Sequence, residues 1–189
     1  MPSPIFHTVA AVTAAVCTRK PKSLYPWALC ALLVLAANLP DFDLIPAIVF
    51  GSPPMRYHHG FTHSFGFCLA AGLLLSLIPL KHVRWGTRFF LLVGVAFSHL
   101  ILDLLNANTS VGCLQLFDCG QPLAWPLLSR KWGTLYPIFG DLALTTGIAS
   151  WFTPSNMLTL SAECGYALLF FLTFWLARQA YVKVRTIRP

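Results

Sequence analysis

Apolar runs separated by short groups of basic residues constrain the fold of this chain more than any other feature. Four runs lie in the first part of the chain, at residues 5–17, 24–39, 61–80 and 89–105, and two more follow at 136–152 and 167–177. A membrane-spanning helix needs about 20 mainly apolar residues, with a range of roughly 17–25. The run at 61–80 is long enough to span a membrane by itself, whereas the run at 5–17 falls short of that length. We therefore predict an all-α, polytopic membrane helical bundle with about four to six membrane-embedded helices.

The composition supports this prediction. Of the 189 residues, 57% are hydrophobic and only 10% are charged, whereas a soluble domain carries about 25% charged residues. We expect one integral-membrane domain over residues 1–189, with the lipid bilayer as its main partner. The net charge of +7 also suits nucleic acid, but the 13 Lys and Arg residues occur in short groups at the ends of apolar runs. That distribution is typical of membrane flanks, so we expect no nucleic-acid partner.

The basic residues also predict a topology. They follow the first run, separate the third from the fourth, and fill the C-terminal tail. They are Arg19, Lys20, Lys22, Lys81, Arg84, Arg88, Arg178, Lys183, Arg185 and Arg188. The positive-inside rule places all three groups in the cytoplasm. If the runs at 136–152 and 167–177 both crossed the membrane, the tail would end outside, so we expect the run at 136–152 to re-enter or to lie in the interface.

Acidic and histidine side chains collect on the opposite side of this map, where odd-numbered runs begin and even-numbered runs end. They are His7, Asp41, Asp43, His58, His59, His63, His99 and Asp103. A charged group near the middle of a membrane costs about 2.5–3.5 kcal/mol on insertion scales. A shared metal site is the simplest way to offset that cost.

Local spacing favours such a site at three places. His99 and Asp103 are four residues apart, so they share one face of a helix. Pro40 is expected to disfavour helix before it and to keep the following segment extended, so that Asp41 and Asp43 point the same way.

The stretch HHGFTHS contributes the third place. A turn at Gly60 would bring His58 and His63 together, and Thr62 or Ser64 would cap the helix that follows. Imidazole and carboxylate are ligands of zinc and similar divalent ions.

Other classes of protein remain as alternatives. A metal or ion transporter would also place His and Asp within membrane runs, although spread through the bilayer depth rather than collected at one face. A non-catalytic protein stabilised by a metal needs only four ligands, fewer than the eight candidates. In the loop at 106–135, Cys113 and Cys119 are placed so that an oxidising compartment would allow a disulfide.

Four stretches together resemble a known family: FHTVAA, NLPDFD, HHGFTHS and SHLILDLLNANTSVGCLQLFDCGQPLAWPL. They are similar to the bacterial inner-membrane family of YdjM type, membrane-bound metal-dependent hydrolases with a distant likeness to zinc-dependent phospholipase C and S1/P1 nuclease. The resemblance runs from His7 to about residue 141. Members usually have Arg where this chain has His59, which makes His58 and His63 the better candidate ligands.

The resemblance implies a phospholipase C-like helical core and a site of two or three divalent ions, zinc first, with manganese or iron as alternatives. Its metal ligands would come from His7, Asp41, Asp43, His58, His63, His99 and Asp103. The implied location is the bacterial inner membrane, multi-pass, with the site facing the periplasm or exterior.

The implied activity is metal-dependent hydrolysis of a phosphoester, a lipid headgroup or a lipid-linked phosphate, by metal-activated water. Asp41 or Asp43 would serve as bridging ligand or general base, and the residues leave open which of the two. Arg56 would hold the substrate phosphate, or alternatively would be an interfacial arginine whose charge reaches the headgroups.

Overall fold

The computed structural model describes residues 3–18, 27–50, 57–81, 83–105, 120–133, 138–140, 142 and 152–187. Within these residues the regular secondary structure is helical, and the β-type pairing that is present is an isolated bridge between Gln121 and Trp132. The expected run at 136–152, the pair Cys113 and Cys119, and Arg56 lie almost wholly or wholly outside the described residues. The all-α prediction is confirmed for the part that is described.

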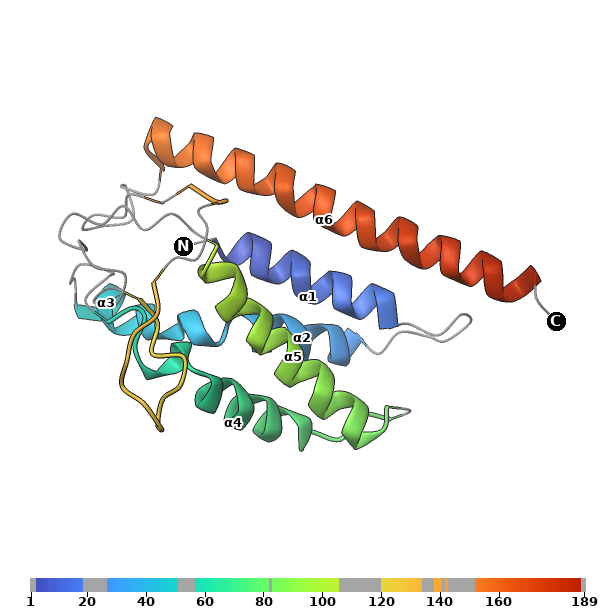
Figure 1. Ribbon diagram of the computed structural model, residues 1–189, viewed down its shortest axis with the longest axis horizontal. Helices are drawn as coiled ribbons and strands as arrows, with labels where there is room; N and C mark the ends of the chain where they lie inside the picture. The colour runs from blue at the N-terminus through green and yellow to red at the C-terminus, as the bar shows by residue number, and fades with distance from the viewer. Residues whose placement is uncertain are drawn as a thin grey trace.

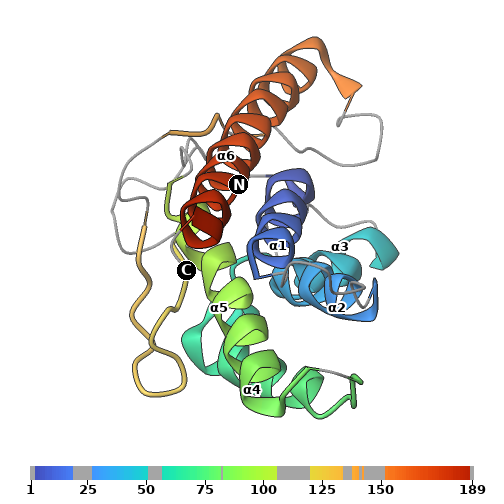
Figure 2. The ribbon, with the colours of Figure 1, turned by 90° about the vertical axis from the view of Figure 1, so that its right-hand side faces the viewer.

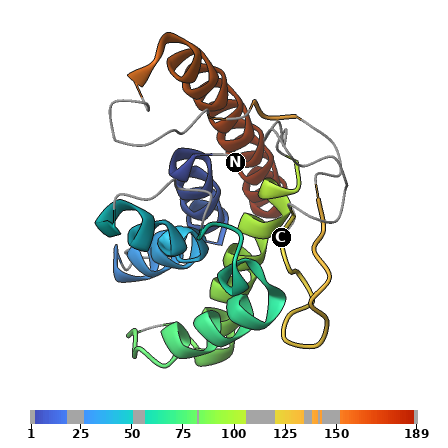
Figure 3. The same ribbon diagram turned by 90° about the vertical axis from the view of Figure 1, so that its left-hand side faces the viewer.

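Helices α1 (Pro4–Thr18), α2 (Trp27–Asn38), α4 (Phe65–Ser76) and α5 (Trp85–Asp103) form the bundle, with α6 (Pro154–Ile187) along α1. Successive helices of the bundle run in opposite directions, as Figure 1 shows. The start of α1, the end of α2, the start of α4 and the end of α5 therefore gather at one end. The short helix α3 (Ile45–Phe50) lies beyond the end of α2 in Figure 1, and Figures 2 and 3 show the bundle from its two ends.

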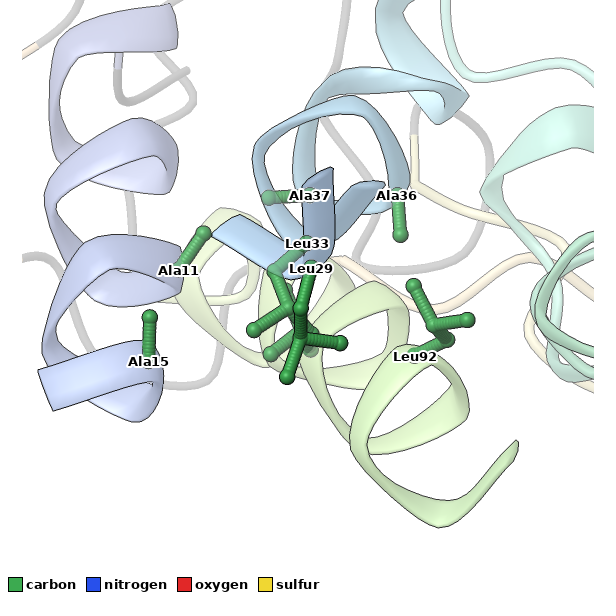
Figure 4. Packing of buried hydrophobic residues seen from close by; sticks show 8 residues of the cluster. Ala11, Ala15, Leu29, Leu33, Ala36, Ala37 and Leu92 are labelled. Carbon is green, nitrogen blue, oxygen red and sulfur yellow. The ribbon is translucent and has the colours of Figure 1, made fainter. Parts of the chain in front are cut away.

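Small side chains bring α1, α2 and α5 into contact. Ala11 and Ala15 of α1 face Leu29 and Leu33 of α2, and Leu92 of α5 closes the cluster (Figure 4). Where the surrounding lipid is as apolar as the helices, close packing between small residues drives helix association. The α4–α5 contact follows the same rule, because a Cβ on Gly72 would lie 2.4 Å from Cγ2 of Val93.

Two helices among the described residues are long and apolar enough to cross a membrane: α5 and the Pro154–Arg185 part of α6. Helices α1, α2 and α4 are apolar but shorter. With 12 residues, α4 is about 18 Å long, so the prediction that the run at 61–80 spans alone is not confirmed. Ser64 begins α4 as its N-cap, and Pro79 disfavours helix just before it, which explains why the helix is shorter than the apolar run.

Segment 39–44 differs from the extended conformation expected for it. Pro40–Leu44 is a 3-10 helix, and Leu39 already has a right-handed helical backbone with φ −61° and ψ −36°. Proline is tolerated in the first turn of a helix because its missing N–H has no partner there. The predicted effect of Pro40 on Leu39 was wrong, although the acidic side chains still reach the same site.

Candidate metal centre

All eight predicted acidic and histidine side chains meet at one end of the bundle. His7 comes from the start of α1, Asp41 and Asp43 from the 3-10 helix after α2, and His99 with Asp103 from the end of α5. The three remaining histidines come from the segment before α4. His58, His63 and His99 have fully buried side chains, and so has His7. These residues thus gather at one end of the bundle, and their location on one side of the membrane stays a prediction.

Four of these residues form a compact group: Asp41, His63, His99 and Asp103, all buried. Nε2 of His99 lies 3.3 Å from Nε2 of His63. Oδ1 of Asp41 lies 3.5 Å from each of these nitrogens, and Oδ2 of Asp103 lies 3.4 Å from His63 Nε2 and 3.2 Å from His99 Nε2. Ligand atoms around a tetrahedral zinc lie roughly 3.3–3.6 Å apart, because each is about 2.0–2.2 Å from the ion. The spacing of this group therefore fits a zinc ion.

The hydrogen bonds of the two histidines support the same conclusion. His99 Nδ1 donates to the carbonyl oxygen of Ala37 at 2.7 Å, because a carbonyl can only accept. His63 Nδ1 lies 3.1 Å from Oδ2 of Asp43 and donates a hydrogen bond to it. In the neutral rings both Nε2 atoms are then lone-pair acceptors that face each other and two carboxylates. A cation between them removes that repulsion, and ligating histidines in metal sites are commonly held by such a bond at the other nitrogen.

The two acidic residues of segment 39–44 are placed differently. Asp43 accepts hydrogen bonds from His58 Nδ1 at 2.9 Å, from His63 Nδ1, and from Thr62 Oγ1 at 2.9 Å. Both oxygens of Asp41 are buried and have no hydrogen-bond partner among the described residues. Asp43 is thus arranged to orient histidines, whereas Asp41 has both oxygens available to a ligand. The sequence alone left this choice open.

Buried atoms without a hydrogen-bond partner concentrate in the site. Among the described residues, side-chain atoms of this kind occur at His7, Asp41, His58, His59 and Asp103, beside a few elsewhere. Such atoms are costly unless an ion or water satisfies them. The donor set of imidazole nitrogens and carboxylate oxygens is the set that zinc, manganese and iron accept.

His59 belongs to the site, although the sequence placed it in doubt. Its Nε2 lies 4.0 Å from Oδ2 of Asp103, and its ring centroid lies 4.2 Å from that of His58. His58, His59 and His63 form a second group able to hold an ion, and it shares His63 with the first. His59 has φ +59°, a left-handed conformation that is uncommon for residues other than glycine. The expected turn is therefore made at His59, while Gly60 has φ −78°.

His7 lies at the α1 side of the group. Its ring stacks on His99 with centroids 3.8 Å apart, and its Nε2 is 3.4 Å from Oδ1 of Asp103. Neither ring nitrogen has a hydrogen-bond partner among the described residues. His7 is consequently free to extend the ligand set of Asp103.

The electrostatics of the loop residues follow from these contacts. Burial raises the pKa of Asp41, but the charge of His99 and the nearby imidazoles of His63 and His99 outweigh the effect of burial and hold the pKa below its ordinary value. The same balance, with His58 and His63 as donors, lowers the pKa of Asp43. Burial lowers the pKa of His63, while Asp41 and Asp43 raise it above its ordinary value overall. The lowered pKa values favour the ionised form of both carboxyl groups, which attracts positive charge to the site.

The helix cap predicted for α4 positions the histidines. Ser64 Oγ accepts from the backbone N–H of Phe67 at 3.1 Å and donates to the carbonyl of Phe61 at 2.6 Å. The N–H of Phe65 donates to the carbonyl of Leu123 at 2.8 Å. These bonds attach the histidine segment to the start of α4 and to the loop at 120–133.

Comparison with known proteins assigns the chain to a family. The family model described as YdjM inner membrane protein matches residues 1–185. No curated protein and no solved structure matches the chain. Since the match covers nearly the whole length, and since the buried His and Asp cluster and apolar helices lie within it, the chain belongs to the YdjM inner membrane protein family.

Proposed function

We propose that this chain is a membrane-embedded, metal-dependent hydrolase that acts on a phosphoester at the outer face of the inner membrane. The supporting observation is the spacing of Asp41, His63, His99 and Asp103, whose ligand atoms lie 3.2–3.5 Å apart in the pairs given above. A multi-pass topology and a core like that of zinc-dependent phospholipase C belong to the same proposal.

The ligand set is larger than a structural site needs. A structural zinc is closed by four protein ligands, whereas catalytic sites keep a position open for water or substrate. Asp41, His63, His99 and Asp103 would hold one ion, and His58 and His59 offer further nitrogens for a second. This surplus favours a catalytic site of more than one ion over a scaffold.

Bound divalent ions would supply an activated water, with its pKa lowered to near 7, and would polarise the phosphoryl oxygen. Asp43 would hold His58 and His63 in the tautomer that presents Nε2 to the site, and the Ala37 carbonyl would do the same for His99. Asp41 would bind the ion and accept a proton from the attacking water. Arg56, as the sequence suggests, would contact the substrate phosphate.

The proposal is tested by hydrolysis measured on the purified full chain in lipid vesicles. The substrates are a lipid phosphodiester, a lipid phosphomonoester and a soluble aryl phosphate, each with added zinc or manganese. Wild type should release product, and a chelator or the variant Asp103→Asn should stop it. Glu163→Gln is the matched control, because Glu163 is a buried acid of α6 whose Oε1 accepts hydrogen bonds from Ser3, which an amide oxygen retains.

Each other outcome counts against the hydrolase. Product release that is unchanged in Asp103→Asn would show a contaminating enzyme. A metal-loaded protein that hydrolyses none of the three substrates, yet carries metal across vesicle membranes, would support the transporter instead.

A further inference from the structure

A cavity lies between α1, α5 and α6. Its volume is about 330 Å³, and its walls come from residues 10–18 of α1, 90–98 of α5 and two phenylalanines of α6, Phe170 and Phe174. Pockets that bind small molecules have volumes of about 300–1,000 Å³ and mostly apolar walls. The cavity is therefore of the size that a ligand requires.

The hydroxyl groups in the wall of the cavity donate their hydrogen bonds within their own helices. Thr13 Oγ1 donates to the carbonyl of Val9 at 2.7 Å, and Ser98 Oγ donates to the carbonyl of Val95 at 2.7 Å. Thr18 Oγ1 likewise donates to the carbonyl of Ala14 at 2.8 Å. Because these hydroxyl protons are used within their own helices, the cavity offers no row of donors to an ion or to water. It fits a hydrocarbon occupant.

Two helix faces connect the cavity with the metal centre. On α5, Leu91 and Val95 line the cavity, and His99 and Asp103 continue the same face at intervals of four residues. On α1, Ala10 and Ala14 line the cavity, and His7 lies one turn before Ala10. On both helices, the residues that line the cavity are followed, toward the same end of the bundle, by the candidate metal ligands.

His7 stands at the junction of the two. Its ring has no hydrogen bond among the described residues. It stacks on His99, and its Nε2 lies 3.4 Å from Oδ1 of Asp103.

The dimensions suit one chain of a lipid. Residues 10–18 and 90–98 each extend about 12 Å along their helices, close to the thickness of one leaflet, which is half of the roughly 30 Å hydrocarbon core. The length of the cavity is thus close to the thickness of one leaflet, and Ala10 and Ser98 of its wall are close in sequence to His7 and His99 of the polar site. An amphiphile with a charged head and a long tail matches this arrangement, with its head at the polar site and its tail in the apolar cavity.

We propose that the cavity between α1, α5 and α6 binds the hydrocarbon chain of the substrate, so that the substrate is an amphiphilic phosphoester whose head lies at the metal centre. This inference rests on the proposed function and specifies its substrate class. It makes a soluble phosphoester a poor substrate and a single-chain lipid phosphate a good one.

Photolabelling of the metal-loaded full chain tests the inference without measuring hydrolysis. The probe is hexadecylphosphonate with a diazirine in the middle of its chain, and the labelled residues are identified by peptide mass spectrometry. We expect label on residues 10–18 and 90–98 in excess of Leu73 and Leu74, which are exposed on α4. Unlabelled hexadecylphosphonate should compete, and a hexadecane probe without the head should not show the preference.

Two glycines supply a matched pair of variants. A Cβ on Gly94, which lines the cavity, meets no atom within 4 Å, and the same holds for Gly165 of α6, which does not line it. Gly94→Leu should fill part of the cavity and lower its labelling about tenfold, which corresponds to a loss of about 1.4 kcal/mol in binding free energy. Gly165→Leu should leave labelling unchanged.

The results separate this inference from the proposed function. Equal labelling of the cavity and of α4, or labelling that Gly94→Leu does not change, would show surrounding lipid only and would overturn the inference. Short-chain phosphoesters hydrolysed as well as long ones would do the same, while the hydrolase would stand. Head-dependent labelling of the cavity in a protein that hydrolyses no phosphoester would support the cavity and overturn the hydrolase.

Discussion

Exchange of Asp43 for asparagine separates a residue that orients ligands from one that binds the ion. Asp43 accepts from His58 Nδ1, His63 Nδ1 and Thr62 Oγ1 at 2.9–3.1 Å. An asparagine has one acceptor oxygen, and its amide nitrogen can only donate. At least one of the two imidazole N–H groups would therefore lose its acceptor.

The size of the effect follows from this loss. Removal of a group that orients a metal-binding histidine costs about 10–100-fold in metal affinity, which is about 1.4–2.7 kcal/mol. We expect Asp43→Asn to keep the metal stoichiometry with an affinity lower by that factor. Asp41→Asn should lower the affinity by more, because it removes a negatively charged ligand from the group with His63, His99 and Asp103.

The assay is competition between the purified protein and a chromophoric zinc chelator, for wild type, Asp43→Asn, Asp41→Asn and the control Glu163→Gln. The reasoning is refuted if Asp43→Asn weakens binding as much as Asp41→Asn does. It is also refuted if Asp41→Asn binds zinc like wild type. Either result would show that the two acidic residues have been given the wrong roles.

Three further predictions concern packing, protons and the second group of histidines. Gly72→Ala should lower the free energy of unfolding by about 1–3 kcal/mol, because the added Cβ would meet side-chain and backbone atoms of Val93 at 2.4–3.0 Å. Gly94→Ala should not lower it, because the Cβ there meets open space. Equilibrium unfolding in mixed detergent measures both variants. Bound metal should be lost as the pH falls from about 7 to about 5, because protons compete with the ion for Nε2 of His63, whose pKa lies above its ordinary value, and for the other imidazole nitrogens. Retention of all metal after dialysis at the lower pH would contradict this. His59→Arg should remove at most one ion per chain and keep the ion of the four-residue group, and loss of all metal would show that His59 is needed by both groups.

The sequence predicted which residues meet because it predicted the direction of the helices. Alternating apolar runs place the start of one helix beside the end of the next, so His7, His99 and Asp103 could be brought together without knowledge of any contact. The interval of four between His99 and Asp103 is likewise a property of the helix alone. These parts of the site depend on periodicity, which a sequence shows directly.

The remaining parts depend on contacts between segments. Proline in the first turn of a 3-10 helix and proline in an extended segment look alike in sequence, so the conformation of residues 40–44 was mistaken. The separate roles of Asp41 and Asp43 are set by His58, His63 and Thr62, up to 22 positions along the chain. The left-handed conformation of His59 had no signal beyond the neighbouring Gly60. Ser64 and Pro79 indicate where α4 begins and ends, but a prediction from the length of the apolar run alone does not use them.

The central claim is that the buried His and Asp cluster binds metal, and metal content per chain tests it most directly. Mass spectrometry of the detergent-purified full chain should find about two or three divalent ions in wild type and in Glu163→Gln. His99→Ala and Asp103→Ala should lose them while keeping their helical circular dichroism. Wild-type protein that is folded and metal-free after purification and zinc addition would contradict the account.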